Sequence, residues 1–81
     1  MKVVRLISLY DKKTKKLVRE VNIDFIDFHI LKKIFNPPLR DSLMYDFYWV
    51  EKEEAKLIKE YVSFDFELDK YIYQVECFQA D

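Results

Sequence analysis

The chain has 81 residues, about the length that supports one hydrophobic core and no second domain. Apolar residues make up 51% of the sequence and aromatic residues 17%, so large rings supply much of that core. Glycine is absent, which excludes the Gly-rich loops of nucleotide-binding proteins and the glycine-flanked turn that exposes the serine of many hydrolases. We expect one domain over residues 1–81.

Cysteine use and hydropathy predict a protein of the cytoplasm. Cys77 is the only cysteine and has no partner for an internal disulfide, and no charged-then-apolar leader opens the sequence. The longest apolar stretches are a few residues long, whereas a helix needs about 20 residues to cross a bilayer. We therefore expect no membrane segment.

Charge is distributed unevenly along the chain although the net charge is only −1. Residues 1–40 hold ten Lys or Arg and four Asp or Glu, a balance of +6, whereas residues 41–81 hold four Lys and eleven Asp or Glu, a balance of −7. Ten of the fourteen aromatic residues also lie in the acidic half. Such asymmetry suggests an electrostatic partner.

The first part of the chain predicts a β-hairpin. Residues 2–10 are rich in Val, Leu and Ile on both alternating faces, which is typical of a strand that is central in its sheet or covered on two sides. Residues 17–23 form the second strand after a polar loop that begins with Asp11. Because the chain lacks glycine, left-handed turn positions must be filled by Asn, Asp or Lys.

A helix of about ten residues follows the hairpin. Asp24 or Asp27 can accept hydrogen bonds from the free amides at its start, and apolar residues then recur at helical spacing as far as Phe35. Asn36 suits a left-handed C-terminal cap, and Pro37-Pro38 cannot continue the helix because proline lacks an amide proton. This is the firmest predicted boundary.

The second half predicts another helix and a final strand. Residues 45–49 are a short aromatic stretch that either pairs as an edge strand or packs without pairing. Residues 51–62 form a helix with acidic residues at its positive N-terminal end. Residues 64–69 alternate apolar and acidic side chains with period two, and residues 71–78 form a strong strand. The predicted class is α+β, with an antiparallel or mixed sheet packed with two helices in the order β-β-α-(β)-α-β.

No pattern in the sequence predicts catalysis. His29 is the only histidine, and neither the serines nor Cys77 has a spacing to it that favours a catalytic triad. Asp24, Asp27 and His29 have the composition of a metal site, but a helix start explains both aspartates and no second His or Cys cluster joins them. We expect no enzyme activity, no metal and no cofactor.

Four lysines crowd the turn of the hairpin: Lys12, Lys13, Lys15 and Lys16. Such a turn could reach nucleic-acid phosphates, or it could simply be a solvated loop that keeps the hairpin soluble. No aromatic residue is interleaved for base stacking, and the pI of about 5.8 argues against nucleic-acid binding.

The stronger signal is a mixture of carboxylates and rings in the acidic half. Charge steers encounter with a basic protein and aromatic anchors hold the bound state, so this pattern is either a docking surface for such a partner or an ordinary solvated face. The candidate partner-binding residues are Asp46, Tyr48, Trp49, Asp65, Glu67, Asp69, Tyr73 and Glu76.

Three short patches carry a resemblance to a known group of proteins. They are Tyr10-Asp11-Lys12-Lys13-Thr14 with Leu17-Val18-Arg19-Glu20, then Met44-Tyr45-Asp46, and then Tyr71-Ile72-Tyr73-Gln74-Val75-Glu76-Cys77. Together they resemble a family of small uncharacterised bacterial proteins, which is similar in size and context to immunity proteins of toxin systems such as contact-dependent growth inhibition. The chain departs from that family at Phe35-Asn36-Pro37-Pro38, where a Gly often follows the first helix, and at Val50-Glu51. The resemblance supplies no functional residues.

The resemblance and the charge pattern together predict an immunity protein. Its expected partner is a cognate toxin domain of the basic RNase or DNase type, whose active site or substrate groove it would occlude. One alternative is a phage-type or host inhibitor that mimics nucleic acid. Another is a small nucleic-acid-binding module that uses the lysine-rich turn.

Overall fold

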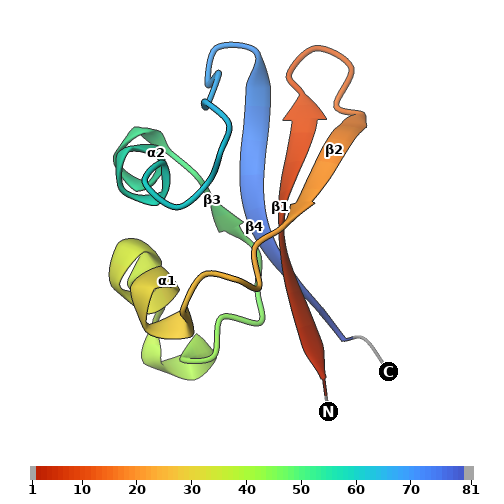
Figure 1. Ribbon diagram of the computed structural model, residues 1–81. Coiled ribbons are helices and arrows are strands. Elements are labelled where there is room, and N and C mark those ends of the chain that lie inside the picture. Colours follow the sequence, from red (N-terminus) through yellow and green to blue (C-terminus); the bar gives the residue numbers. More distant parts are fainter. Residues whose placement is uncertain (1, 80–81) are drawn as a thin grey trace.

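Two helices lie on one face of a four-stranded antiparallel sheet in the computed structural model, which describes residues 2–79 (Figure 1). The elements are β1 Val3–Asp11, β2 Leu17–Asn22, α1 Phe28–Phe35, a short 3-10 turn η1 Leu39–Asp41, β3 Tyr48–Trp49, α2 Lys52–Ile58 and β4 Tyr71–Gln79. The predicted α+β class and element order are confirmed, and all three strand pairings are antiparallel.

The strand order is β2-β1-β4-β3, so β1 is a central strand as its two apolar faces predict. β1 pairs with β2 on one side and along its whole length with β4 on the other, from Val3 opposite Gln79 to Asp11 opposite Tyr71. The aromatic stretch whose pairing the sequence left open contributes the two-residue edge strand β3, which pairs with β4.

The ends of α1 lie where the sequence predicts them. The carboxylate of Asp27 accepts a hydrogen bond of 2.8 Å from the backbone N–H of His29, whereas Asp24 binds the backbone N–H of Arg5. Asn36 adopts a left-handed conformation with φ 47° and ψ 61° and closes the helix. The two other left-handed residues of the described chain are Lys15, in the hairpin turn, and Met44.

The second helix is shorter than predicted, because it covers Lys52–Ile58 and not residues 51–62. Glu51 precedes it and donates its backbone N–H to the carboxylate of Glu54. Beyond the helix the chain turns and brings Phe64 against the core. No Pro or Gly marks this stop, so tertiary packing overrides a helical charge pattern here.

Residues 64–69 form an extended loop and not a strand. Their predicted alternation is nevertheless present in space: the three apolar side chains are half-buried against the core, and the three acidic side chains are exposed. The two-residue period therefore reports which side of the loop faces the protein.

The core lies between the helices and the sheet. Its fully buried members include Ile7 of β1, Leu31 of α1, Ile58 of α2 and Tyr73 of β4. No helix within residues 2–79 has the length and apolar character needed to span a membrane.

Candidate functional site

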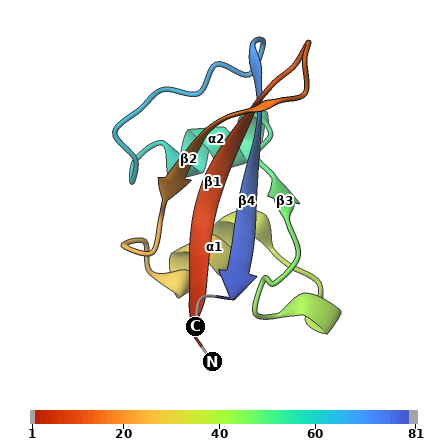
Figure 2. The ribbon, with the colours of Figure 1, turned by 90° about the vertical axis from the view of Figure 1, so that its right-hand side faces the viewer.

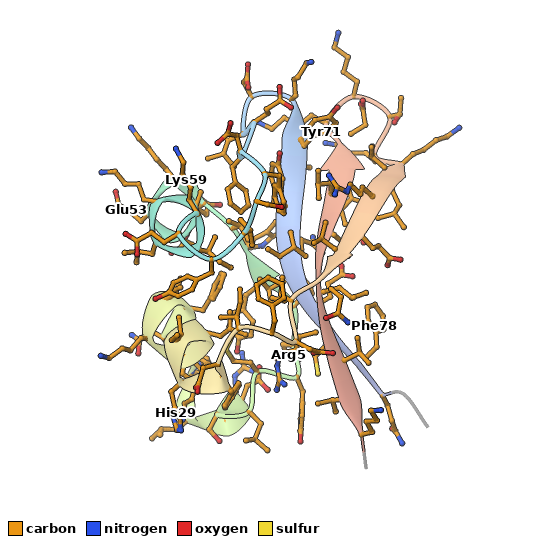
Figure 3. All side chains as sticks on the ribbon, in the orientation of Figure 1. Arg5, His29, Glu53, Lys59, Tyr71 and Phe78 are labelled. Carbon is orange, nitrogen blue, oxygen red and sulfur yellow. The ribbon has the colours of Figure 1, made fainter. Side chains whose placement is uncertain are left out.

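One face of the sheet carries no helix. Ile7, Leu9, Tyr73 and Val75 point toward the helices, so the residues between them on the same strands point to the opposite side. Figure 2 presents this side to the viewer with the helices behind the sheet, and Figure 3 shows Phe78 pointing away from α1. We call this surface the helix-free face. Its residues from β1, β4 and β3 are Val4, Leu6, Ser8, Tyr10, Trp49, Ile72, Gln74, Glu76 and Phe78.

Five of the nine residues of the helix-free face are apolar, although a solvated sheet face is usually polar. Trp49 is 49% exposed and Phe78 is 46% exposed. Phe47, two residues before Trp49 and 54% exposed, packs edge-on against the Trp49 ring with the centroids 5.4 Å apart, and it extends the face. Antiparallel sheets that meet water on one side normally place polar residues there. Exposed rings gathered on one surface mark an interaction site more often than scattered ones.

Glu76 is an acidic group at the middle of this face, and Glu20 of the edge strand β2, paired with Ser8, is a second one. Oε1 of Glu76 accepts a hydrogen bond of 2.9 Å from the Ser8 hydroxyl, and its Oε2 accepts one of 3.0 Å from the Tyr10 hydroxyl. Burial, followed by the hydrogen bond to Glu76, raises the pKa of Tyr10. Within residues 2–79 no Lys or Arg nitrogen lies within 4 Å of the Glu76 carboxylate. The face therefore carries a fixed negative charge without a counterion.

The candidate acids Asp65, Glu67 and Asp69 lie elsewhere, in the loop between α2 and β4. Asp65 is 4.0 Å from the ammonium of Lys59, and Glu67 is 3.9 Å from that of Lys70. These pairs are exposed and contribute little to stability. The three acids are exposed, but they share neither the face nor the neighbours of Glu76.

The acidic loop also lies beside the lysine-rich turn of the hairpin. The backbone N–H of Lys12 donates to the carbonyl of Lys70 across 3.2 Å, and Figures 1 and 2 both show the two loops side by side at one end of the sheet. The fold thus brings the basic and acidic halves of the sequence together at this end. Each cluster weakens the attraction of the other for a charged partner.

Tyr73 and Tyr48 belong to the interior side of the sheet. Tyr73 is 2% exposed, its ring packs on Phe64 and Phe66, and its hydroxyl accepts the backbone N–H of Glu67. A partner cannot reach it, so the prediction that Tyr73 anchors a complex does not fit this fold. Tyr73 and Glu76 are three residues apart on β4, and an odd spacing places two side chains of a strand on opposite faces.

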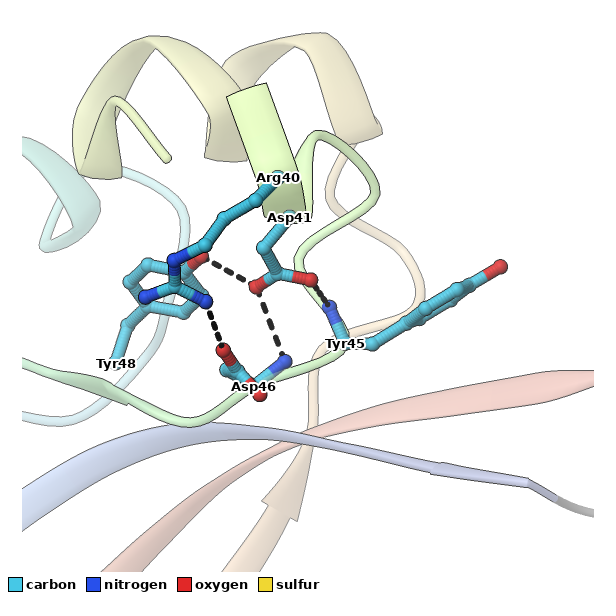
Figure 4. A network of polar contacts seen from close by, with 5 residues as sticks. All are labelled: Arg40, Asp41, Tyr45, Asp46 and Tyr48. Carbon is cyan, nitrogen blue, oxygen red and sulfur yellow. Dashed lines mark hydrogen bonds and ion pairs between the residues drawn. The ribbon is translucent and has the colours of Figure 1, made fainter. Parts of the chain in front are cut away.

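Tyr48 and Asp46 take part in a polar network around Asp41 (Figure 4). The Asp41 carboxylate accepts the hydroxyl of Tyr48 and the backbone N–H groups of Tyr45 and Asp46. Asp46 in turn pairs with Arg40 at 3.1 Å. The network fixes the loop that leads into β3 and thereby positions Trp49. Asp41 was not among the candidate residues predicted from the sequence, because nothing in its local pattern separates it from a loop aspartate.

The same contacts shift the pKa values of both partners. The Tyr48 hydroxyl, followed by the two backbone N–H groups, holds the pKa of Asp41 below its ordinary range. Burial and the hydrogen bond to Asp41 raise the pKa of Tyr48 to about 12.

The raised pKa of Tyr48 predicts a loss of stability in alkali. The contribution of Tyr48 to the free energy of unfolding is complete below its unfolded pKa of about 10. It is lost as the pH rises toward 12, because Tyr48 ionises first in the unfolded chain. Urea unfolding of the native protein and of Tyr48→Phe should therefore show a larger drop between pH 9 and pH 11.5 for the native protein. Equal drops would mean that Tyr48 ionises as easily in the fold as outside it.

The described residues contain no group of three or more His, Cys, Asp or Glu side chains that could hold a metal ion. His29 is exposed in the first turn of α1 (Figure 3). Asp24 and Asp27 are occupied with the backbone contacts described above.

Comparison with protein-family models identifies a relationship. No curated protein matches the sequence. A family model matches residues 4–76, which include all of the strand pairs that define the sheet except the outermost ones of β1 and β4. The chain therefore belongs to the family described as a domain of unknown function, DUF7683.

Proposed function

We propose that this protein binds another protein through its helix-free face, and that the partner is a bacterial toxin domain that it neutralises as an immunity protein. The observation that supports this most is the group of exposed rings on the helix-free face, which lie near the Glu76 carboxylate, a group without an ion-pair partner among residues 2–79. Aromatic residues at the centre of an interface supply much of its binding energy, and Trp leads that group.

The resemblance to immunity-type proteins supports the choice of partner. Such a complex needs about 800 Å² from each side. The acidic loop with Asp65, Glu67 and Asp69 then lies at a different place, and its acids can assist encounter with a basic toxin without forming the contact. The lysine-rich turn is a weaker candidate for nucleic acid, because the neighbouring acids offset its charge.

The test begins with co-expression of the chain and the product of the gene just upstream. If the two form a complex, Trp49→Ala should weaken it by about 30-fold, since loss of a central aromatic anchor typically removes about 2 kcal/mol. Leu39→Ala is the matched control, because Leu39 is 96% exposed but lies in η1, outside the helix-free face. It should change affinity by less than about threefold.

The complex also has a built-in reporter, because Trp49 is the only tryptophan. Its fluorescence should shift to shorter wavelength when a partner covers the face. If Trp49→Ala left affinity and protection from the toxin unchanged while reversal of Asp65, Glu67 and Asp69 to Lys abolished them, the contact would lie at the acidic loop and this assignment of the face would be wrong.

A further inference from the structure

Glu76 is a carboxylate that two hydroxyl groups hold in place beside apolar side chains. Its carboxylate accepts hydrogen bonds from the hydroxyls of Ser8 and Tyr10 on the neighbouring strand β1, and Ser8 is fully buried. A carboxylate has about four acceptor positions, so two remain on Glu76 after Ser8 and Tyr10 have taken one on each oxygen. A guanidinium that binds a carboxylate with two parallel N–H groups needs two acceptor positions.

The surroundings of Glu76 favour arginine over lysine. Leu6 lies directly opposite Glu76 on β1. On β4, Phe78 lies two residues after Glu76, and Gln74, which pairs with Trp49, lies two residues before it. The planar guanidinium stacks on aromatic rings and loses less hydration than an ammonium group, while the aliphatic part of the side chain covers apolar surface. A compact ammonium would use neither the rings nor the paired acceptors as well.

The charge of the face argues against two other occupants. In a two-fold dimer centred on this face, two Glu76 carboxylates would approach each other, and like charges across an interface disfavour the complex. Lys2, which precedes β1, lies four residues before Leu6, about 13 Å along an extended chain. An anionic membrane surface would repel Glu76 for the same reason.

We infer that Glu76, held by Ser8 and Tyr10 on the helix-free face, receives one arginine side chain of a protein partner between the rings of Trp49 and Phe78. This inference rests on the proposed function and names the group that the partner contributes. It makes Glu76 the residue that determines specificity, while the rings supply most of the contact area.

The test uses a small probe and needs no toxin. Benzamidinium joins an aromatic ring to a planar cation with paired N–H donors, and benzamide is its neutral counterpart. Titration of the ¹⁵N-labelled full chain, followed by amide shifts in NMR spectra, should give a dissociation constant on the order of millimolar for benzamidinium. The shifts should centre on Ser8, Glu76 and Phe78 and on the indole N–H of Trp49.

Two matched variants identify the charge that binds. Glu76→Gln keeps the shape of the side chain and should weaken benzamidinium binding by roughly tenfold, since a charge-assisted hydrogen bond is lost. Glu67→Gln removes an exposed carboxylate from the acidic loop and should leave the binding unchanged. If Glu76→Gln does not fold, Phe78→Ala replaces it and should reduce the shift at the indole N–H and the affinity together.

Three results would overturn the inference: no shift with benzamidinium, equal shifts with benzamide, or shifts centred on residues 65–69. None of these would disprove toxin binding, which the Trp49→Ala experiment tests separately. Conversely, a functional complex that tolerates Glu76→Gln would keep the proposed function and remove the arginine receptor.

Discussion

Replacing Tyr73 with alanine will lower the free energy of unfolding by about 3–5 kcal/mol, the usual range for truncating a large buried ring. Tyr73 is almost completely buried and packs against the rings of Phe64, Phe66 and Tyr71. Its loss opens a cavity beneath the loop of residues 63–70. Urea unfolding followed by Trp49 fluorescence and by circular dichroism measures the change.

A milder variant keeps this prediction testable. A domain of 81 residues has a net stability of about 4–12 kcal/mol, so the alanine variant can fall below the folding threshold. Tyr73→Phe removes only the hydrogen bond from the backbone N–H of Glu67 and should cost about 0.5–1.5 kcal/mol. Tyr45→Ala, at a ring that is 47% exposed, is the control and should change stability by less than either. A stable Tyr73→Ala protein would show that the ring does not support the core.

Replacing Asp41 with alanine will destabilise the protein by about 2–4 kcal/mol. Asp41 is 8% exposed and accepts hydrogen bonds from two backbone N–H groups and one hydroxyl. Each donor left without a partner near the interior costs about 1–3 kcal/mol, and this cost is smaller where water can replace the lost partner. The loop that positions Trp49 should loosen as well. Hydrogen exchange at the amides of Tyr45 and Asp46 should therefore accelerate, in addition to the shift of the urea midpoint.

Acid provides an independent readout for Asp41. Because the folded pKa of Asp41 lies below its unfolded value of 3.8, its contribution is fully present above about pH 5 and is lost as the pH falls through the folded pKa. The difference in stability between the native protein and Asp41→Ala should therefore shrink below pH 4. Asp46→Ala is the matched control, since it removes only an exposed pair with Arg40 and should change stability by about 0–1 kcal/mol. Equal losses in the two variants would contradict the role of Asp41.

Local chemistry was enough to predict most of the fold. Asn36 and the two prolines after it fixed the end of α1, and the apolar character of both faces of residues 2–10 predicted the central position of β1. The end of α2 was missed because no residue there forbids a longer helix. That end depends on Phe64 reaching Tyr73, a contact between segments that periodicity within one segment cannot reveal.

The candidate surface was predictable only in part. Trp49 and Glu76 do share a face, but the remaining acids were grouped by their nearness in sequence, and the fold distributes them over the acidic loop and the network around Asp41. Residues of one strand alternate between faces. Tyr73 and Glu76 therefore lie on opposite faces of the sheet, although they are only three residues apart in the sequence. The apolar faces of residues 2–10 predicted a strand that is central or covered on two sides, and which face of Val4 and Leu6 carries a helix could not be read from the sequence.

The pairing of β1 with β4 affects folding during synthesis as well as the stability of the folded protein. About 60 residues separate Asp11 from its partner Tyr71, and ribosomes add roughly 5–20 residues per second, so β1 waits about 3–12 s for the strand that completes the sheet. During that interval the β1–β2 hairpin has an unpaired edge and two apolar sides in water. Newly synthesised molecules are therefore most prone to aggregate before β4 emerges, and shielding by a chaperone will matter most in that window.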